Sequence, residues 1–299
     1  VERWNITQAF GSPALWNVVG QYCQQYQLAM PTIRRVLSAG APVPPHVLQR
    51  MMQAISPEGD IFTPYGATEA LPVASISARE ILAETADQTR KGRGTCVGKA
   101  FSGIDWKVIA ISDGPLKSIN EVTELSTGQI GELIVRGPVV TTEYVTSAEA
   151  NQWHKITDGS GFWHRMGDVG YLDPQGRFWF CGRRTHRVVT QQGTLFTVMC
   201  EAVFNEHPAV YRSALVGVGE PGHHTPVLIA ETWPDQKPAS NQATELLLEE
   251  LRQIASQHEH TREIEHFMWH PSLPVDIRHN AKIFREKLAR WAADRLSGS

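Results

Sequence analysis

Apolar residues in the first ninety or so positions recur with helical spacing, separated by short apolar runs. Leu15 and Tyr22 follow this spacing after a Ser-Pro start, and a second helix is predicted over 46–55. The runs at 33–37 and 60–63 have the length and composition of buried strands. This alternation of strands and helices predicts part of an α/β domain.

The pattern changes after residue 94 to short segments rich in β-branched and aromatic residues. Such segments occupy 106–111, 131–135 and 177–181, and turn residues such as Asp113-Gly114 separate them. We therefore expect a small antiparallel sheet or barrel here.

The last third of the chain mixes both patterns. The expected elements are helices over 200–207, 243–257 and 281–296 and strands over 213–218 and 227–231. The last helix would place Phe284, Leu288, Trp291 and Leu296 on one face. The predicted organisation is an α/β part-domain over 1–92, a small β subdomain over 93–182 and a separate α+β domain over 183–299.

Charge and composition exclude several classes of protein. The 299 residues carry a formal net charge of -3, and Lys and Arg are scattered without a basic stripe, so nucleic acid is not an expected partner. No apolar run approaches the roughly 20 residues of a membrane span, so no transmembrane segment is expected. The four cysteines are far apart and form no Cys-x-x-Cys pair, which favours reduced thiols and a cytoplasmic location.

Two short motifs in the first part of the chain suit a nucleotide. The glycine of Ser38-Ala39-Gly40-Ala41-Pro42 would let backbone approach a flat ligand, and Tyr65, at a turn with Gly66, could cover such a ligand's face. Thr68 offers a hydroxyl to a phosphate, and Glu69 offers a carboxylate of the kind that holds Mg²⁺. Taken alone, both motifs also fit ordinary turns with a half-buried Tyr and a solvated Glu.

Further motifs follow in a specific order. They are Gly161-Phe162-Trp163-His164-Arg165-Met166-Gly167-Asp168, Gly170-Tyr171-Leu172-Asp173 and Phe178-Trp179-Phe180-Cys181-Gly182-Arg183. Together with the two earlier motifs, this set resembles the adenylate-forming superfamily of acyl-CoA synthetases, luciferases and peptide-synthetase adenylation domains. The resemblance implies ATP as substrate, AMP as product, Mg²⁺ as the metal, and a mobile C-terminal lid formed by 183–299.

The resemblance also implies roles for individual residues. Gly40, Ala41 and Pro42 match the adenine-binding turn, and Tyr65, followed by Gly66, matches the aromatic residue that stacks on adenine. Thr68 matches the hydroxyl that contacts the α-phosphate, and Glu69 the carboxylate that binds Mg²⁺. Asp168 matches the acid that accepts hydrogen bonds from both ribose hydroxyls, and Arg183 a ribose-contacting arginine at the hinge. Lys282 matches the lysine that bridges the substrate carboxylate and the α-phosphate during adenylation.

The sequence departs from the family's pattern at several places. Met166 replaces a Thr, Thr185-His186 occupies the usual hinge position, and Asn280-Ala281 stands where a Gly commonly precedes the lysine. The family's Ser/Thr/Gly-rich loop for the β- and γ-phosphates does not occur in these residues. The chain also opens Val-Glu-Arg-Trp-Asn without Met, so we expect the later part of a longer enzyme, catalytically incomplete by itself.

The residues around Arg183 and Lys282 suggest a substrate. The stretches 182–188 and 275–285 are most similar to the β-lactone synthetases of bacterial olefin biosynthesis. That similarity implies a long-chain β-hydroxy fatty acid whose own hydroxyl attacks the acyl adenylate, with other olefin-pathway enzymes as possible partners. The alternatives are a long-chain fatty acyl-CoA ligase and a non-catalytic nucleotide-binding module. Chain length, stereochemistry, the base for the hydroxyl and the oligomeric state are not encoded in any recognisable motif.

Overall fold

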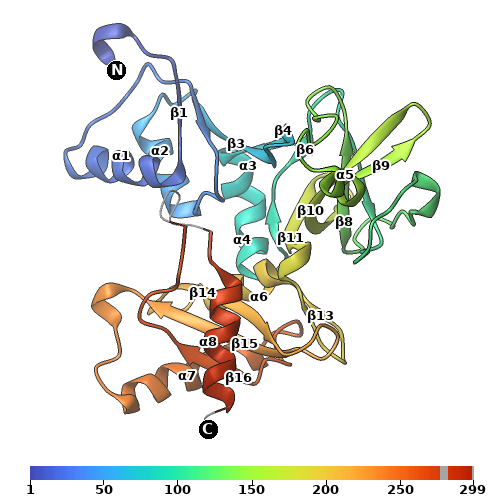
Figure 1. The fold of residues 1–299 in the computed structure, drawn as a ribbon. Helices are drawn as coiled ribbons and strands as arrows, with labels where there is room; N and C mark the ends of the chain where they lie inside the picture. Colours follow the sequence, from blue (N-terminus) through green and yellow to red (C-terminus); the bar gives the residue numbers. More distant parts are fainter. Residues whose placement is uncertain (277–281, 298–299) are drawn as a thin grey trace. The chain divides into compact units, whose positions relative to one another are not determined.

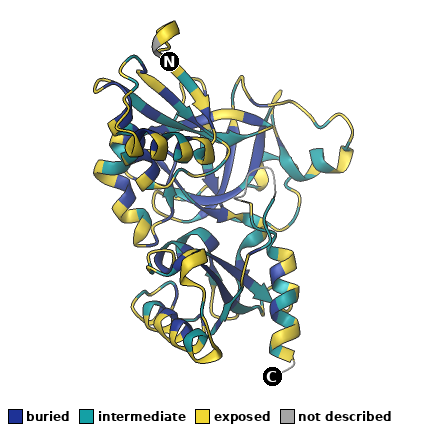
Figure 2. Ribbon diagram, turned by 90° about the vertical axis from the view of Figure 1, so that its left-hand side faces the viewer, coloured by how far each residue is buried: buried dark blue, intermediate teal, exposed yellow. Residues whose placement is uncertain are grey.

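A computed structural model describes residues 1–276 and 282–297, which fold as two compact units (Figure 1). The first unit contains 1–87 and 95–180, and the second contains 88–94 and 181–299. Each unit has its own sheets and its own buried clusters. Figure 2 shows buried residues concentrated along the strands and exposed residues along loops and outer helix faces.

A five-stranded sheet with the order β1-β2-β3-β4-β6 begins the first unit. Strands β1 (Gln8–Gly11), β2 (Arg35–Ser38) and β3 (Asp60–Ala67) are parallel, and β4 (Ala70–Ser77) and β6 (Lys99–Ala100) continue the sheet antiparallel. Helices α1 (Pro13–Gln25) and α2 (Pro45–Ala54) provide its cover. Trp16, Leu48 and Met51 pack with Val36 and Ile61 of the sheet. The α/β prediction for this region is confirmed.

After β4 the chain passes through a short helical segment made of α3 (Ala78–Glu80), a π-helical turn (Ile81–Thr85) and α4 (Ala86–Arg90). The second sheet of the first unit has the order β5-β11-β10-β8-β7, with β9 paired to β10. Its strands are β5 (Thr95–Cys96), β7 (Asp105–Ile109), β8 (Gly131–Arg136), β9 (Lys155–Asp158), β10 (Gly161–Leu172) and β11 (Phe178–Arg183). A short helix, α5 (Ala148–His154), precedes β9.

A shared cluster of buried side chains joins the two sheets of the first unit. Ala70, Val73 and Ala74 of β4 pack with Leu133 of β8 and Phe178 of β11, among others. Because β4 and β3 form one hairpin, this cluster fixes the end of β3 against the second sheet. The elements that carry Tyr65 and Asp168 therefore belong to one compact unit.

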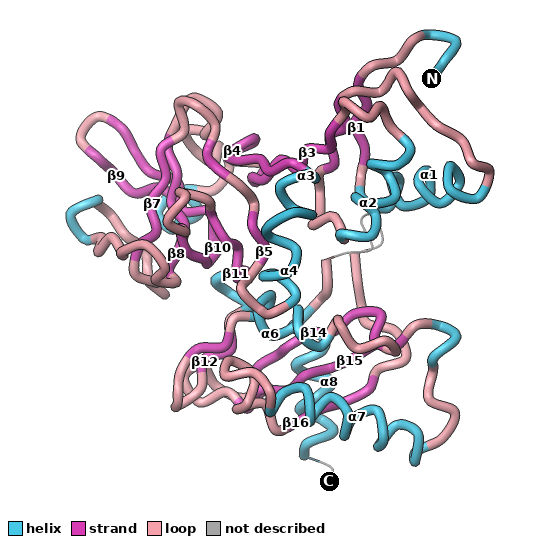
Figure 3. Tube along the Cα trace, turned by 180° about the vertical axis from the view of Figure 1, so that it is seen from behind, coloured by secondary structure: helices cyan, strands magenta, loops and turns pink. Residues whose placement is uncertain are grey.

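The second unit is built on a three-stranded sheet with helices on both faces (Figure 3). Strands β14 (Val210–Val218) and β15 (Thr225–Thr232) are antiparallel, and β16 (His266–Trp269) runs parallel to β15. Leu215 and Leu228 face a cluster with α6 (Thr197–Phe204) and α7 (Asn241–Ser256), whereas Val216 and Val227 face α8 (Arg285–Ser297). A two-stranded ribbon, β12 (Val188–Val189) and β13 (Thr194–Leu195), completes it.

Several element boundaries differ from those expected. The helix expected over 200–207 is α6 (Thr197–Phe204), which begins and ends three residues earlier. The strand expected to end at a Tyr65-Gly66 turn continues to Ala67, because β4 pairs with it beyond Tyr65. The last helix begins at Arg285 and not at Ala281, which lies outside the described residues. Ile283 pairs with Val275, and the Phe284 amide donates to the Pro274 carbonyl at 2.9 Å. Phe284 therefore precedes the helix. Of the expected apolar face, Leu288, Trp291 and Leu296 pack against the sheet.

The four cysteines are free and buried. Burial raises the pKa of Cys96 and of Cys181 to about 12, and it also raises the pKa of Cys23 and Cys200. We expect these thiols to resist iodoacetamide at pH 8 in the native protein and to react fully after denaturation, because the thiolate is the reactive form. Mass spectrometry of the alkylated peptides measures this, with Gln242→Cys on the exposed side of α7 as a fast-reacting control. Labelling of Cys181 as fast as the control would contradict the packing described.

Candidate functional site

The turn between β3 and β4 carries Thr68 and Glu69. Gly66 lies so close to the returning strand that a Cβ there would come within 2.3 Å of the Ala70 carbonyl oxygen. The pairing of β3 and β4 is irregular between Tyr65 and Ala67. A glycine at this position therefore permits the tight hairpin. At its tip, Thr68 is exposed and Glu69 is half-buried.

Tyr65 lies on the same strand, just before this hairpin. Its ring is half-buried, with centroids 6.0 Å from Phe178 and 6.4 Å from Phe180. Its hydroxyl donates a hydrogen bond to Oδ2 of Asp168, which is 103 residues further along the chain. The structure thus brings these two predicted residues into direct contact.

Asp168 is presented by a bulge in β10. Three residues, Met166 to Asp168, lie between the paired positions Arg165 and Val169, where β8 has only Leu133. Gly167 has φ +68°, a left-handed conformation that a residue with a side chain adopts at a cost of about 1–2 kcal/mol. The extra residues turn the Asp168 side chain toward β3, and it is only 4% exposed.

A fully buried ion pair fixes the strand immediately before the bulge. Arg165 donates from Nε and Nη2 to the two carboxylate oxygens of Glu132, at 2.9 and 2.6 Å. Both side chains are 1% exposed. The remaining guanidinium hydrogens reach the carbonyl oxygens of Ser112 and Gly114 at 2.7 Å and of Trp153 at 3.3 Å. Such a pair is tolerated in a core only because its donors are satisfied.

No motif in the sequence points to this pair. The sequence does place one charged residue in each of two apolar strands. Glu132 is followed by Leu-Ile-Val, and Arg165 comes shortly after Phe-Trp. Because buried charges are normally paired, these positions could have indicated an ion pair.

Glu69 belongs to a half-buried polar network. Tyr144 donates from its hydroxyl to Glu69 Oε1 at 3.0 Å. Burial raises the pKa of Glu69, but hydrogen bonds from its own backbone and from Tyr144, with the nearby His164 and His154, outweigh burial and leave that pKa below its ordinary value. Burial and then the Glu69 contact raise the pKa of Tyr144 to about 12. Glu69 is therefore a carboxylate, and Tyr144 a neutral donor, at neutral pH.

Two histidines and a lysine lie beside Glu69. Burial, followed by the charge of Lys155, lowers the pKa of His164 to about 4, so this imidazole is neutral at pH 7. His164 Nδ1 lies 3.2 Å from the His154 carbonyl oxygen. Burial also lowers the pKa of Lys155, whose ammonium donates to the Thr141 carbonyl and lies 4.9 Å from the Phe162 ring centroid.

The predicted adenine turn connects β2 to α2. Gly40 has φ +98°, which explains a glycine at this position, and Pro42 is exposed. The turn follows the carboxyl end of β2, a parallel neighbour of β3. Gly40 to Pro42 and Tyr65 to Glu69 therefore lie at the same edge of the sheet, where ligands bind in many α/β folds.

Arg183 and Lys282 belong to the second unit. Arg183 is exposed at the end of β11, after Gly182, whose φ is +138°. Lys282 is exposed, and its carbonyl accepts from the Asp276 amide at 2.9 Å. The substituted positions Asn280 and Ala281 lie outside the described residues.

The start of α8, next to Lys282, is anchored to the core of the second unit. Arg285 bonds both carboxylate oxygens of Glu201, and its Nη1 also donates to the Leu215 carbonyl at 2.9 Å. His186 follows Arg183 in the segment predicted to contain the hinge, and burial, then the charge of Arg285, lowers its pKa to about 4.

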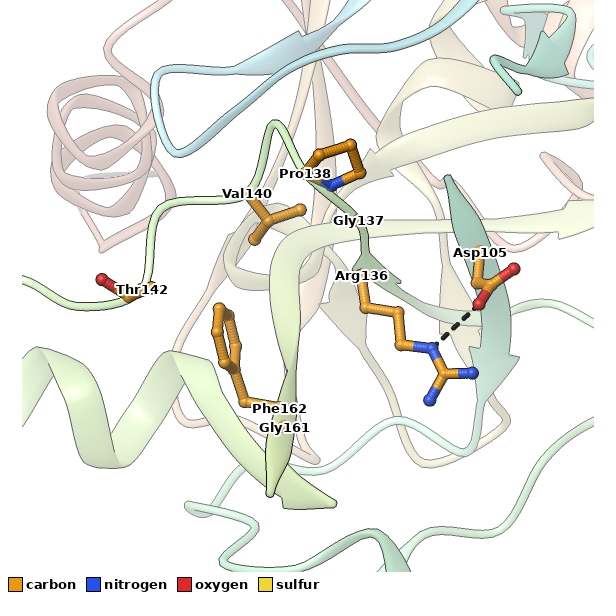
Figure 4. A pocket seen from close by; sticks show the side chains of 8 residues that line it. All are labelled: Asp105, Arg136, Gly137, Pro138, Val140, Thr142, Gly161 and Phe162. Carbon is orange, nitrogen blue, oxygen red and sulfur yellow. Dashed lines mark hydrogen bonds and ion pairs between the residues drawn. The ribbon is translucent and has the colours of Figure 1, made fainter. Parts of the chain in front are cut away.

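A pocket of about 440 Å³ opens on the second sheet of the first unit (Figure 4). It is lined by Asp105, Arg136, Gly137, Pro138, Val140, Thr142, Gly161 and Phe162. Arg136 is already paired with Asp105 at 2.9 Å and Asp158 at 3.1 Å. The pocket includes no residue predicted for the nucleotide, but its Val140 and Thr142 flank Thr141, whose amide donates to the Glu69 carbonyl oxygen at 2.8 Å.

Within 1–276 and 282–297, no cluster of three or more His, Cys, Asp or Glu side chains could hold a metal ion. The same residues include no helix long and apolar enough to cross a membrane.

Comparison with known proteins identifies the family. A model of the family described as "AMP-binding enzyme" matches residues 1–145. The chain is 46% identical over 296 residues to the olefin beta-lactone synthetase of Xanthomonas campestris, covering 97% of this chain and 52% of that protein. This chain belongs to the AMP-binding enzyme family. A second family member, the olefin beta-lactone synthetase of Stenotrophomonas maltophilia, is 45% identical over 99% of this chain and 53% of its own length. The chain therefore spans about half the length of these curated relatives.

Solved structures support the AMP-binding enzyme fold. The amide bond synthetase McbA from Marinactinospora thermotolerans matches with a TM-score of 0.73 at 22% identity, over 97% of this chain and 54% of McbA. The o-succinylbenzoate coenzyme A synthetase MenE from Bacillus subtilis, solved with ATP and magnesium, matches with a TM-score of 0.72 at 21% identity, over 96% of this chain and 52% of MenE. The predicted fold class is thereby confirmed.

The Arg165–Glu132 pair generates a stability prediction. Arg165→Met in the complete protein leaves a carboxylate buried without its partner, so we expect a loss of roughly 3–5 kcal/mol in the free energy of unfolding. Arg136→Met, in the same sheet but with a half-exposed side chain, should cost less than about 1 kcal/mol. Urea denaturation of the two variants measures both values. Equal losses would contradict the stabilising role assigned to the buried pair.

Proposed function

We propose that the complete protein activates a long-chain carboxylic acid as an acyl adenylate, and that it converts a β-hydroxy acid to a β-lactone. The observation that carries this proposal is the 45–46% identity to two olefin beta-lactone synthetases over 97–99% of the chain. The contact between Tyr65 and Asp168 supports it, because these two side chains suit the adenine and ribose of one nucleotide.

Each predicted site residue keeps its proposed role. Gly40, Ala41 and Pro42 would lie along adenine, and Tyr65, with the close approach that Gly66 allows, would stack on it. The buried Asp168 carboxylate would accept from the ribose hydroxyls, a task suited to a charged acceptor. Arg183 would contact the ribose from the second unit.

The residues at the hairpin fit a magnesium ion that is shared with a nucleotide. Mg²⁺ is commonly held by one or two carboxylates together with substrate phosphates, which agrees with an ionised Glu69 and with no three-residue cluster among the described residues. When bound, the ion would neutralise charge on the phosphates. Thr68, exposed beside Glu69, would donate its hydroxyl to the α-phosphate.

Two bond exchanges make up the proposed reaction. In the first, a carboxylate oxygen of the substrate attacks the α-phosphorus of ATP, and the bond to pyrophosphate breaks. The Lys282 ammonium would stabilise the negative charge that accumulates between the carboxylate and the α-phosphate. In the second, the β-hydroxyl oxygen attacks the acyl carbon, its proton is lost, and AMP leaves with the electrons of the mixed-anhydride bond. Holding the hydroxyl near the carbonyl would provide much of the rate acceleration of this second step.

A long-chain fatty acyl-CoA ligase is the second candidate. An acyl-CoA ligase of Aspergillus niger is 26% identical over 73% of this chain, which supports an acid substrate without favouring the lactone. In that reaction a thiol, and not the substrate's own hydroxyl, attacks the adenylate.

We further propose the organisation and setting of the complete protein. Residues 1–92 would complete an α/β nucleotide-binding domain, 93–182 would form the small β subdomain, and 183–299 would be a lid. The four free, buried thiols support a cytoplasmic location. Enzymes that supply the β-hydroxy acid or consume the lactone would be its partners.

Product analysis tests the activity. We expect the complete protein to convert ATP and a long-chain β-hydroxy acid to AMP, pyrophosphate and a β-lactone, with the same yield with or without coenzyme A. A thioester formed only with coenzyme A would identify a ligase, and nucleotide binding with no pyrophosphate release would identify a non-catalytic module.

Replacing Lys282 tests the division of labour between the two steps. Lys282→Ala should slow adenylate formation at least ~100-fold, because it removes a charge that stabilises the transition state. Conversion of preformed acyl adenylate to product should be nearly unchanged if the lid moves between steps. Single-turnover assays measure both rates, with Lys287→Ala, an exposed lysine of α8, as the control. Equal slowing of both steps would rule out a role confined to adenylation.

A further inference from the structure

The segment 137–147, here called the strap, connects β8 to α5 and crosses the Thr68–Glu69 hairpin. Val140 forms an antiparallel bridge with Ala70, and the Thr141 amide donates to the Glu69 carbonyl oxygen at 2.8 Å. These contacts fix the backbone of Glu69. Backbone contacts do not, however, fix the direction of its carboxylate.

One strap residue reaches the carboxylate itself. The hydroxyl of Tyr144 donates to Oε1 of Glu69 at 3.0 Å. Among the residues that the structure describes, Tyr144 is the only one whose side chain donates to this carboxylate. Seventy-five residues separate the two in the chain, so this bond exists only in the folded unit.

Tyr144 is in turn held in place by α5. Asn151 accepts from the Tyr144 amide at 2.7 Å and donates to the Tyr144 carbonyl at 3.0 Å, so one side chain fixes the backbone on both sides. The ring centroids of Tyr144 and His154 are 5.8 Å apart, and the Lys155 ammonium lies 5.7 Å from the Tyr144 ring centroid. Ser147 caps α5 by accepting from the Ala150 amide at 3.2 Å. The hydroxyl is therefore aimed by a supported ring and not by a loose loop.

We propose that Tyr144 is a positioning residue that holds the Glu69 carboxylate in the orientation needed for a divalent cation bound together with nucleotide phosphates. The proposal rests on the metal role of Glu69 given above. By donating to Oε1, Tyr144 restricts rotation of the Glu69 carboxylate. Partners that orient a metal ligand commonly contribute 10–100-fold (about 1.4–2.8 kcal/mol) to metal affinity or activity.

Tyr144→Phe in the complete protein tests this role, since it removes the hydroxyl and keeps the ring. We expect Mn²⁺ to bind about tenfold more weakly, as measured by electron paramagnetic resonance with the protein saturated with α,β-methylene-ATP. Tyr211→Phe is the matched control, because Tyr211 lies in the second unit, where its ring contacts Trp233 and Arg212. The control should bind Mn²⁺ as the unmodified protein does.

A double-mutant cycle with Glu69→Gln separates positioning from packing. If Tyr144 acts through Glu69, Tyr144→Phe should weaken Mn²⁺ binding in the natural background and have no further effect in the Glu69→Gln background. Equal losses in both backgrounds would assign Tyr144 a purely structural role and overturn the proposal. Unchanged binding in Tyr144→Phe, with a loss in Glu69→Gln, would overturn the positioning role alone. Unchanged binding in Glu69→Gln would instead overturn the metal role proposed for Glu69, and the Tyr144 proposal with it.

Discussion

The buried pair of Arg165 and Glu132 is the constraint on which the candidate site depends. It joins Arg165, the last paired residue of β10 before the bulge, to Glu132 of β8, which pairs with Val169 just after the bulge. Arg165 also donates to the carbonyls of Ser112, Gly114 and Trp153. Charges this deeply buried are stable only in one arrangement, because moving either partner leaves the other charge unpaired in a low-dielectric core. The bulge that follows therefore begins at a fixed place, and Asp168 is directed toward Tyr65 by the fold rather than by its own flexibility.

The opposite end of the candidate site has a similar construction at the β3–β4 hairpin. Close approach at Gly66 sets the turn, the strap fixes the backbone of Glu69, and Tyr144 contacts its carboxylate. The shared apolar cluster between β4 and the second sheet ties the two ends together. Residues that bind or orient a charged ligand are thus supplied by strands and supported loops of one unit, which limits reorganisation when the ligand arrives.

Local pattern was sufficient to predict most elements, because turn chemistry and strand ends depend on neighbouring residues. The roles of the site residues came from the family resemblance, and they stay predictions. Local pattern was insufficient where the outcome depends on partners far along the chain. The spacing of Leu15 and Tyr22 identified α1, yet both are exposed, and Trp16 and Cys23 face the core. Pairing with β4 extended β3 through the expected turn, and pairing of Ile283 with Val275 delayed the start of α8. Tyr144 was missed because nothing near it in sequence indicates Glu69.

Tyr65 and Asp168 are proposed to form the adenosine end of a nucleotide site, and every other proposed role depends on this one. Titration calorimetry of AMP into the complete protein and into Asp168→Asn tests it directly. Hydrogen bonds to charged groups contribute about 1.5–3 kcal/mol each, so the variant should bind AMP at least about tenfold more weakly while its urea midpoint stays close to that of the natural protein. Equal affinities for AMP, with the variant folded, would contradict the site and the family role assigned to Asp168.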